Sequence, residues 1–148
     1  PAPQPYGQPG APQAPAAPVG PPDPNGLGVA AGRLSNAARK QARTALAVVG
    51  VVLEDGEAVE AVVAGKLDGN PAVLVLTDRA LRLVDERPWR PVSERFTVGG
   101  GLQVQGWQDD RSASLTLVSD GRQLVLDQIG DRAMAVEMAQ RIRYRAGG

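Results

Sequence analysis

The stretch AVLVLTDRALRLVD at residues 72–85 decides the fold of this chain. An uncharged run ends at Thr77, the polar pair Asp78-Arg79 follows, and a second apolar run begins at once. Two apolar runs separated in this way are spaced as the strands of a β-hairpin. We expect Asp78 to hydrogen-bond to the backbone of the turn, and Thr77 to close the edge of the hairpin. Because residues 72–76 include no polar side chain, the pattern does not indicate which face of this strand points into the core.

Short runs of the same kind recur along the chain. Some alternate strictly, as Leu115 and Leu117 do with Ser114 and Thr116, and this alternation is typical of a half-buried strand. Clusters of turn-forming residues separate the runs. We therefore predict seven strands, at residues 57–65, 72–77, 80–85, 94–98, 102–107, 112–118 and 122–129.

A final amphipathic helix is expected to begin at Asp131. Seven antiparallel strands followed by one helix predict a mainly β domain at residues 54–146. Its strands would form an open barrel or orthogonal sandwich, with the C-terminal helix capping the open mouth. The predicted core consists of Leu74, Leu76, Leu81, Leu83, Leu115, Leu117, Leu124, Leu126 and Ile142.

An N-terminal helix is predicted upstream of the strands, at residues 27–53. Small apolar residues recur there at spacings of three and four, and Ser35 could cap the better-formed part of the helix. Its end is ambiguous, because AVVGVVL at residues 47–53 is β-branched enough to form a strand.

The first 26 residues differ in kind from the rest and are predicted to be a disordered Pro-rich linker. Proline recurs at every third position from Pro9 to Pro21, which is the repeat of a polyproline II helix. Such a segment can bind an SH3- or WW-type domain or act as a semi-rigid spacer. The spacer is favoured, because no basic residue occurs before Arg33. Residues 147–148 are expected to be a short tail.

The composition excludes most catalytic and metal sites. The chain has no cysteine and no histidine, so a disulfide, a thiolate nucleophile, an imidazole base and a Cys/His zinc site are all excluded. We expect no enzyme activity, no cofactor and no metal. The chain has 16 Lys and Arg against 16 Asp and Glu, and this balance argues against a nucleic-acid partner.

LVLTDRALRLV at residues 74–84 resembles the second and third strands of bacterial pleckstrin-homology-like domains and, more distantly, GRAM domains. DGE followed by Val59, with a helix upstream, is also similar to such domains. The resemblance covers roughly residues 35–146 and implies the PH-like barrel. It further implies a non-catalytic module that binds a protein partner or associates with its own copies, in a cytoplasmic protein or at the inner face of the membrane.

The resemblance also implies that the loops after the first, third and sixth strands meet at one end of the barrel. Two uses of this rim are open: binding of an anionic ligand, or internal pairing of its cations with Asp68, Glu86 and Asp120. Internal pairing is favoured, because these acidic residues lie in the same loops as the cations. Phosphoinositide binding is disfavoured separately, because the second strand lacks the basic residues that bind such lipids in the family. The candidate rim residues are Lys66, Arg87, Trp89, Arg90 and Arg122.

Anionic membrane lipid is the alternative partner. The predicted N-terminal helix carries Arg33, Arg39, Lys40 and Arg43, and no acidic residue lies between Asp23 and Glu54. A basic amphipathic helix of this kind can lie on an anionic bilayer together with the rim.

Overall fold

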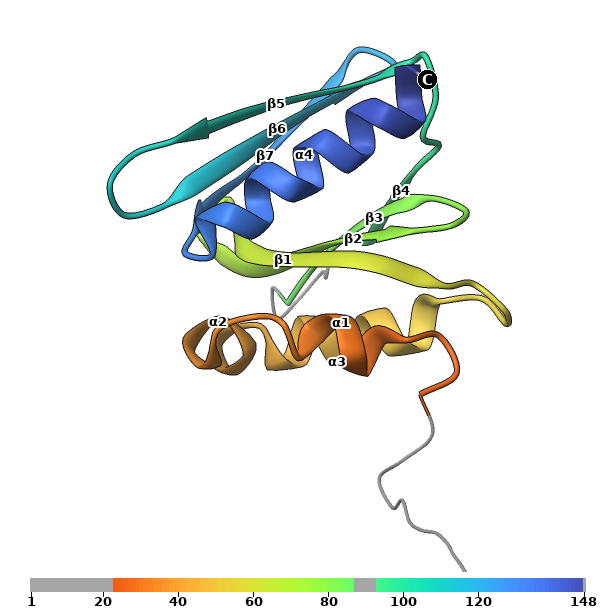
Figure 1. The fold of residues 1–148 in the computed structure, drawn as a ribbon, viewed down its shortest axis with the longest axis vertical. Helices are drawn as coiled ribbons and strands as arrows, with labels where there is room; N and C mark the ends of the chain where they lie inside the picture. Colours follow the sequence, from red (N-terminus) through yellow and green to blue (C-terminus); the bar gives the residue numbers. More distant parts are fainter. Residues whose placement is uncertain (1–22, 87–92, 148) are drawn as a thin grey trace, which may run out of the picture.

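The computed structural model describes residues 23–86 and 93–147. Within these ranges a seven-stranded antiparallel sheet bends around the C-terminal helix, and three short helices cover the outer face of one half of the sheet (Figure 1). The sheet order is β4-β3-β2-β1-β7-β6-β5, and the sheet does not close. The predicted fold class is therefore confirmed, and each predicted strand overlaps an observed one. The strands are β1 Val59–Leu67, β2 Asn70–Thr77, β3 Leu81–Asp85, β4 Ser93–Phe96, β5 Leu102–Gln108, β6 Ala113–Ser119 and β7 Arg122–Ile129.

Strand β1 joins the two halves of the sheet. It pairs with β2 from Val59 to Leu67 and meets β7 at Lys66, which faces Asp127. A β-carbon on the preceding residue, Gly65, would lie 2.5 Å from the carbonyl oxygen of Asp127 and 2.9 Å from the side chain of Ile129. Glycine at this position therefore lets β7 approach β1 closely, where the sheet bends back on itself.

The inner core lies between the two halves of the sheet and helix α4, Arg132–Gly147. Eight of the nine predicted core residues are buried there, and Leu124 is partly buried at its margin. Ile142 on α4 is fully buried against the sheet. The C-terminal helix thus covers the open face of the bent sheet, as expected from its amphipathic pattern.

A second core lies on the outer face of β1–β3, under a layer of three helices (Figure 1). These are α1 Leu27–Ala31, α2 Asn36–Gln41 and α3 Arg43–Val52. On β2, Leu74 and Leu76 face the inner core, whereas Val73 and Val75 face the helices. The uncharged run at 72–76 has no polar face because both faces of the strand are buried.

The N-terminal segment differs from the single helix expected at 27–53, because the structure divides it into three. Gly32 ends α1, and Ser35 begins α2 by accepting a hydrogen bond from the Ala38 amide at 3.2 Å. Residues 47–52 are helical despite their β-branched side chains, since α3 buries Ala45 and Val49 on the sheet. Tertiary packing outweighs local propensity here.

The described residues begin at Asp23, inside the expected linker 1–26. The carboxylate of Asp23 accepts hydrogen bonds from the amides of Gly28 and Val29. The Asn25 side chain donates to the carbonyl oxygens of Glu54 (3.1 Å) and Glu57 (2.6 Å). These bonds tie the start of α1 to the segment before β1. Residues 1–22 of the expected linker, and residue 148 of the expected tail, lie outside the described residues.

The hairpin turn at residues 77–80 is closed by Thr77, as expected. Its hydroxyl accepts hydrogen bonds from the amides of Arg79 (3.1 Å) and Ala80 (3.0 Å). The expected role of Asp78 within the turn is wrong. Its carboxylate accepts instead from the amide of Ala58 at 2.8 Å, beside the start of β1. Asp78 therefore joins the turn to the neighbouring segment, while Thr77 alone supplies the local bonds.

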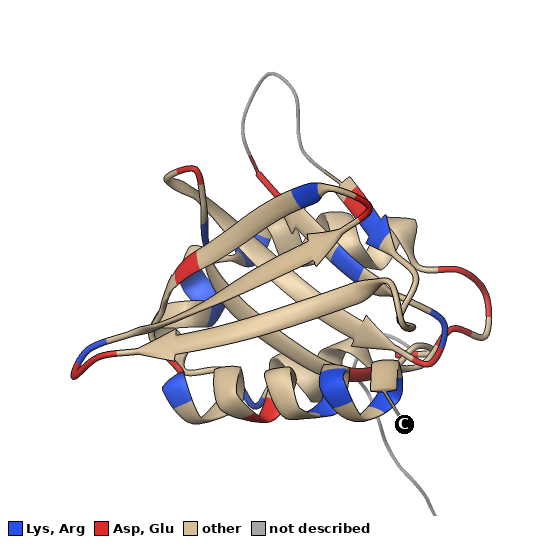
Figure 2. Cartoon of the chain, turned by 90° about the horizontal axis from the view of Figure 1, so that it is seen from above, with Lys and Arg blue, Asp and Glu red and all other residues tan. Residues whose placement is uncertain are grey.

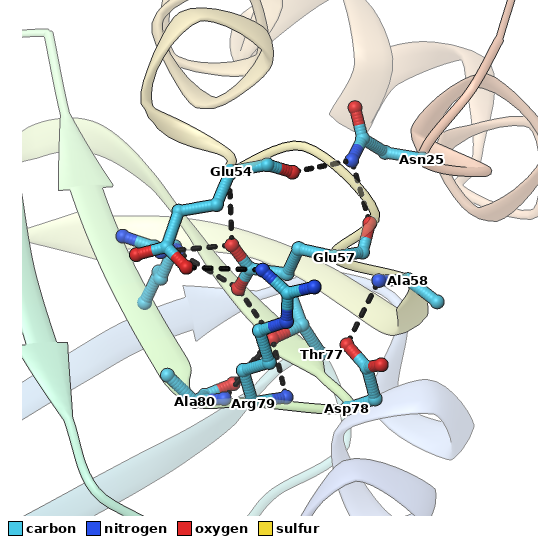
Figure 3. A network of polar contacts seen from close by, with 9 residues as sticks. Asn25, Glu54, Glu57, Ala58, Thr77, Asp78, Arg79 and Ala80 are labelled. Atoms are coloured by element: carbon cyan, nitrogen blue, oxygen red, sulfur yellow. Dashed lines mark hydrogen bonds and ion pairs between the residues drawn. The ribbon is translucent and has the colours of Figure 1, made fainter.

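Glu57 and Arg82 form a buried ion pair next to this turn, and Figure 3 shows Glu57 within the surrounding polar network. The Glu57 carboxylate is fully buried and accepts hydrogen bonds from Arg82 Nε (3.0 Å) and Nη2 (2.8 Å). It also accepts from the Thr77 hydroxyl at 2.5 Å and from the Glu54 amide at 3.0 Å. Burial alone would raise the pKa of Glu57, but these hydrogen bonds outweigh it and lower the pKa from 4.5 to about 2. The carboxylate is therefore charged and structural.

Candidate interaction surface along strand β5

The two edges of the sheet differ in length and charge. Strand β4 has four residues, two of which are Glu94 and Arg95. Strand β5 has seven residues, LQVQGWQ, with neither a charged residue nor a proline. Figure 2 shows β5 as an uncharged strand beside α4, with charges gathered in the turn beyond its end. Short, charged edge strands resist pairing with other chains. Edge β4 has this protection, and β5 does not.

The backbone of β5 offers hydrogen-bonding groups to a further strand. Asp109 N donates to Ser112 O at 2.9 Å, which marks a hydrogen-bonded pair at the end of the β5–β6 hairpin. In an antiparallel ladder, bonded and non-bonded pairs alternate. The register with β6 therefore directs Gln103, Gln105 and Trp107 towards β6 and turns the backbone groups of Val104, Gly106 and Gln108 outwards. In the part of the chain that the structure describes, β6 is the one strand paired with β5.

A hollow of about 190 Å³ lies beside Gly106, between β5 and α4. Leu102 and Val104 are buried on the inner side of β5, and Gly106 is the next residue on that side. Opposite it, Ala135 and Ala139 on α4 are also small. The hollow exists because these three residues leave space that no described side chain fills. Trp107, 63% exposed, forms part of its border.

Neither backbone geometry nor packing explains glycine at position 106. Its φ lies outside the left-handed region, and an added β-carbon would meet Leu115 Cδ2 at an ordinary 3.6 Å. A glycine inside a strand weakens it, and often marks a place where another backbone or a ligand approaches closely. Gly106 is therefore the residue of β5 that most clearly indicates a binding role.

Two further hollows lie on either side of the hollow beside Gly106, along the line where β5 and α4 meet. One, of about 400 Å³, lies between residues 99–105 and the end of α4, and shares Arg143 with the first. Another, more open, lies at the start of α4 and shares Gln108 and Val136 with the first. The three hollows follow one another between residues 99–108 and 130–147 and share lining residues, and they are together called the β5–α4 groove.

The β5–α4 groove carries positive charge. Its charged lining residues are Arg132 and Arg143, and no acidic side chain is among the described residues that line it. Arg132 is held by the carbonyl oxygen of Asp109 at 2.6 Å. Arg143 is exposed and makes no ion pair with any residue in the ranges 23–86 and 93–147. The groove thus offers Arg143 as an available cation beside an apolar hollow.

Asp109, the residue after β5, is bound within its own turn. The Asp109 carboxylate accepts hydrogen bonds from the amides of Ser112 (2.9 Å) and Arg111 (2.8 Å). These backbone bonds lower the pKa of Asp109 below its ordinary value. Asp109 therefore shapes the end of the β5–β6 hairpin.

The predicted rim is partly visible. Arg122, at the start of β7, pairs with Glu94 at 2.7 Å and lies 5.9 Å from the centre of the Phe96 ring. Lys66 lies on β1 opposite Asp127 of β7. Asp127 is five residues after Arg122 along β7. Arg122 is thus paired with Glu94, which is not one of the three acidic residues expected to neutralise the rim. Arg87, Trp89 and Arg90 lie outside the described residues.

The basic residues of the helical layer have different surroundings. Arg33 is tied to Glu137 of α4 at 3.1 Å, and so joins the helical layer to the C-terminal helix. Arg39 donates to the side-chain oxygen of Asn36. Arg39, Lys40 and Arg43 are exposed, at the end of α2 and the start of α3. They lie on the opposite side of the sheet from α4 and its groove (Figure 1).

Sequence reasoning did not find the β5–α4 groove. Its signals were the glycine inside LQVQGWQ and the absence of charge from that strand. Neither signal indicates a binding surface until the strand order is known, because only the strand order shows that β5 is an edge strand. In comparisons with known proteins, no protein-family model matches this chain, and no curated protein does.

Proposed function

We propose that this domain is a non-catalytic, PH-like interaction module that binds an extended segment of a protein partner by strand addition to β5. The observation that supports it most is the uncharged seven-residue edge strand beside a groove that contains a hollow with apolar walls. An added strand would gain main-chain hydrogen bonds from β5, while pockets beside the strand would receive alternate side chains. We further propose that the module works in the cytoplasm or at the inner face of the membrane.

The dimensions of the seam set the length of such a segment. At about 3.3 Å per residue, seven residues of β5 span roughly 23 Å. Along the same seam, α4 runs from Arg132 beside Gln108 to Ala146 beside Leu102, about 21 Å at 1.5 Å per residue. A heptapeptide could therefore contact both walls along the whole groove.

Amide hydrogen exchange tests this proposal. Heptapeptides selected from a random displayed library against the full chain serve as the probe. The amides of Val104, Gly106 and Gln108 should exchange rapidly in the free protein and become protected when such a peptide binds. The amides of Gln103, Gln105 and Trp107 are the internal control, since β6 already protects them. Bound peptides that leave the first three amides unprotected would contradict strand addition.

Self-association through the same edge is a second form of this proposal. Pairing of β5 with the β5 of another copy would protect the same three amides without any peptide. Protection would then rise with protein concentration, together with the mass measured by sedimentation equilibrium. If the mass and the exchange rates stay constant over the concentration range, self-association is excluded and a segment of a protein partner binds β5.

Anionic lipid is the alternative function, supported by the exposed Arg39, Lys40 and Arg43. We rank it second, because the exposed large apolar residues of the described helical layer are Val29 and Val51, which give little area for insertion. In the described ranges, no helix is both long and apolar enough to cross a bilayer. Co-sedimentation with phosphatidylserine vesicles, lost in high salt and in Arg39→Glu/Lys40→Glu, would favour lipid.

A further inference from the structure

We infer that the β5–α4 groove selects segments in which a large apolar residue and an acidic residue lie two positions apart. This inference rests on the proposed function and names the chemistry of the partner. It follows from three features of the groove: an unfilled apolar hollow, an available cation and the distance between them.

The preference for a large apolar residue is inferred from the hollow beside Gly106. Its apolar walls are Gly106 and Leu115 on the sheet and Ala135, Val136 and Ala139 on α4, and polar side chains such as Ser114 and Gln140 complete its lining. A volume of about 190 Å³ exceeds that of a methyl group several times, so a leucine-sized or aromatic side chain could enter it. Such a side chain would cover apolar surface that now faces water, including Val136, which is 39% exposed.

The preference for an acidic residue is inferred from Arg143. Its neighbours on α4, Arg141 and Arg145, are engaged by Glu137 (2.9 Å) and Glu60 (3.2 Å). Arg143 lies on the groove side and has no such partner among the described residues. Because no described acidic side chain lines the groove, a carboxylate from the segment would meet attraction without competing repulsion.

The spacing follows from the geometry of a helix beside a strand. Ala139 lines the hollow, and Arg143 follows four residues later on α4, a rise of about 6 Å. In an extended segment, residues two apart lie about 6.6 Å from each other and project from the same face. Arg143 borders both this hollow and the next one along the groove, so a side chain in the first hollow places the residue two positions towards the second hollow beside Arg143.

Selection from the random heptapeptide library tests the motif. The native full chain should enrich peptides with Asp or Glu two positions from a large apolar residue. Arg143→Glu should reverse the preference at that position to Lys or Arg, and should weaken an acidic peptide selected on the native chain by about tenfold or more. Gly106→Val should shift the apolar position towards small residues, because its side chain occupies the hollow.

Arg95→Glu is the matched control, since Arg95 is exposed on β4, at the other edge of the sheet. It makes the same charge change and should leave the selected motif unaltered. Dispersed amide spectra establish that each variant is folded. Peptides that protect the β5 amides but show no acidic preference would overturn this inference and leave the proposed function standing. If no selected peptide protects those amides, both are overturned.

Discussion

Gly65 and Gly106 both lie inside strands, yet the structure assigns them opposite roles. At Gly65 a β-carbon would collide with the Asp127 carbonyl oxygen at 2.5 Å. At Gly106 it would make an ordinary contact at 3.6 Å. The pair therefore separates a glycine that the fold requires from one that it does not.

Alanine at these two positions should have contrasting effects on stability. Gly65→Ala should lower the free energy of unfolding by roughly 1–3 kcal/mol, because β1 and β7 must move apart. Gly106→Ala should leave it unchanged or raise it by up to about 1 kcal/mol, because alanine has less backbone entropy to lose on folding. Urea unfolding measures both. Equal losses at the two positions would contradict the close crossing at Gly65.

The charge of Glu57 makes stability depend on pH in the acid range. Its pKa is about 2 in the folded chain against an ordinary 4.5, so the unfolded chain binds the proton more tightly. The stabilisation is fully present above about pH 4.5 and disappears as the pH falls towards 2. It amounts to roughly 3 kcal/mol. Urea unfolding between pH 7 and 2 should show this loss, and Glu57→Gln should show a smaller one.

Glu57→Gln also removes one half of a buried ion pair. At pH 7 it should cost about 3–5 kcal/mol, because the Arg82 guanidinium is then buried without its main partner. Glu54 lies 3.7 Å from Arg82 and is half exposed, so it compensates little. Replacing both Glu57 and Arg82 by apolar residues should cost less than the sum of the single changes. Additive costs would show that the two residues act independently.

At the level of elements, the β2–β3 hairpin belongs to two cores. Leu83 faces the core under α4, and its neighbour Val84 faces the core under α1–α3. Leu83→Ala should cost on the order of 2–5 kcal/mol, and Val84→Ala more than about 1 kcal/mol, since both leave cavities. Denaturant unfolding tests the pair. A cost below about half a kcal/mol for Val84→Ala would mean that the helical layer does not pack on β3.

The strands could be predicted from sequence because their signals are local. Alternation at Leu115 and Leu117, and the turn at Asp78-Arg79, need no knowledge of distant residues. The division of 27–53 into three helices could not be predicted, because the helical state of 47–52 depends on packing against β2 and β3. Asp78 was misassigned for a related reason, since its partner Ala58 lies twenty residues earlier.

The candidate site was harder to predict than the fold. The rim was expected on resemblance, and among its described residues Arg122, at the start of β7, is paired with Glu94 on β4. The β5–α4 groove depends on which strands end up at the edges and on where α4 lies over them. A sequence contains the residues of such a groove, LQVQGWQ and Arg143, but not the juxtaposition that gives them a role.

At the scale of the whole molecule, several ion pairs join elements far apart in the chain. Arg33 and Glu137 connect the helical layer to α4, and Arg145 connects α4 to Glu60 on β1. Arg145 also donates to the carbonyl oxygens of Thr77 (2.5 Å) and Asp78 (3.1 Å) in the hairpin turn. The two helical layers are therefore coupled through the shared sheet and its central hairpin.

This coupling predicts that the elements from α1 to α4 unfold as one cooperative unit. Because β2 and β3 supply both cores, loss of either helical layer would expose a face of the same strands. Native-state hydrogen exchange in urea should give the same free energy of global opening for the slowest amides of α3 and of β6. A lower-energy opening that exposes all of α1–α3 and spares β6 would contradict this coupling.

The buried pair of Glu57 and Arg82 also constrains how this fold can change over evolutionary time. A descendant that lost either residue first would have an unpaired buried charge under the hairpin. Selection against unfolding would remove such a descendant from the population. Lineages would then keep both residues or exchange both, and the two positions should covary in any family built on this fold. Thr77, which bonds to the same carboxylate, would follow them. Such a correlated trio would give a signature for finding distant relatives whose overall similarity has faded.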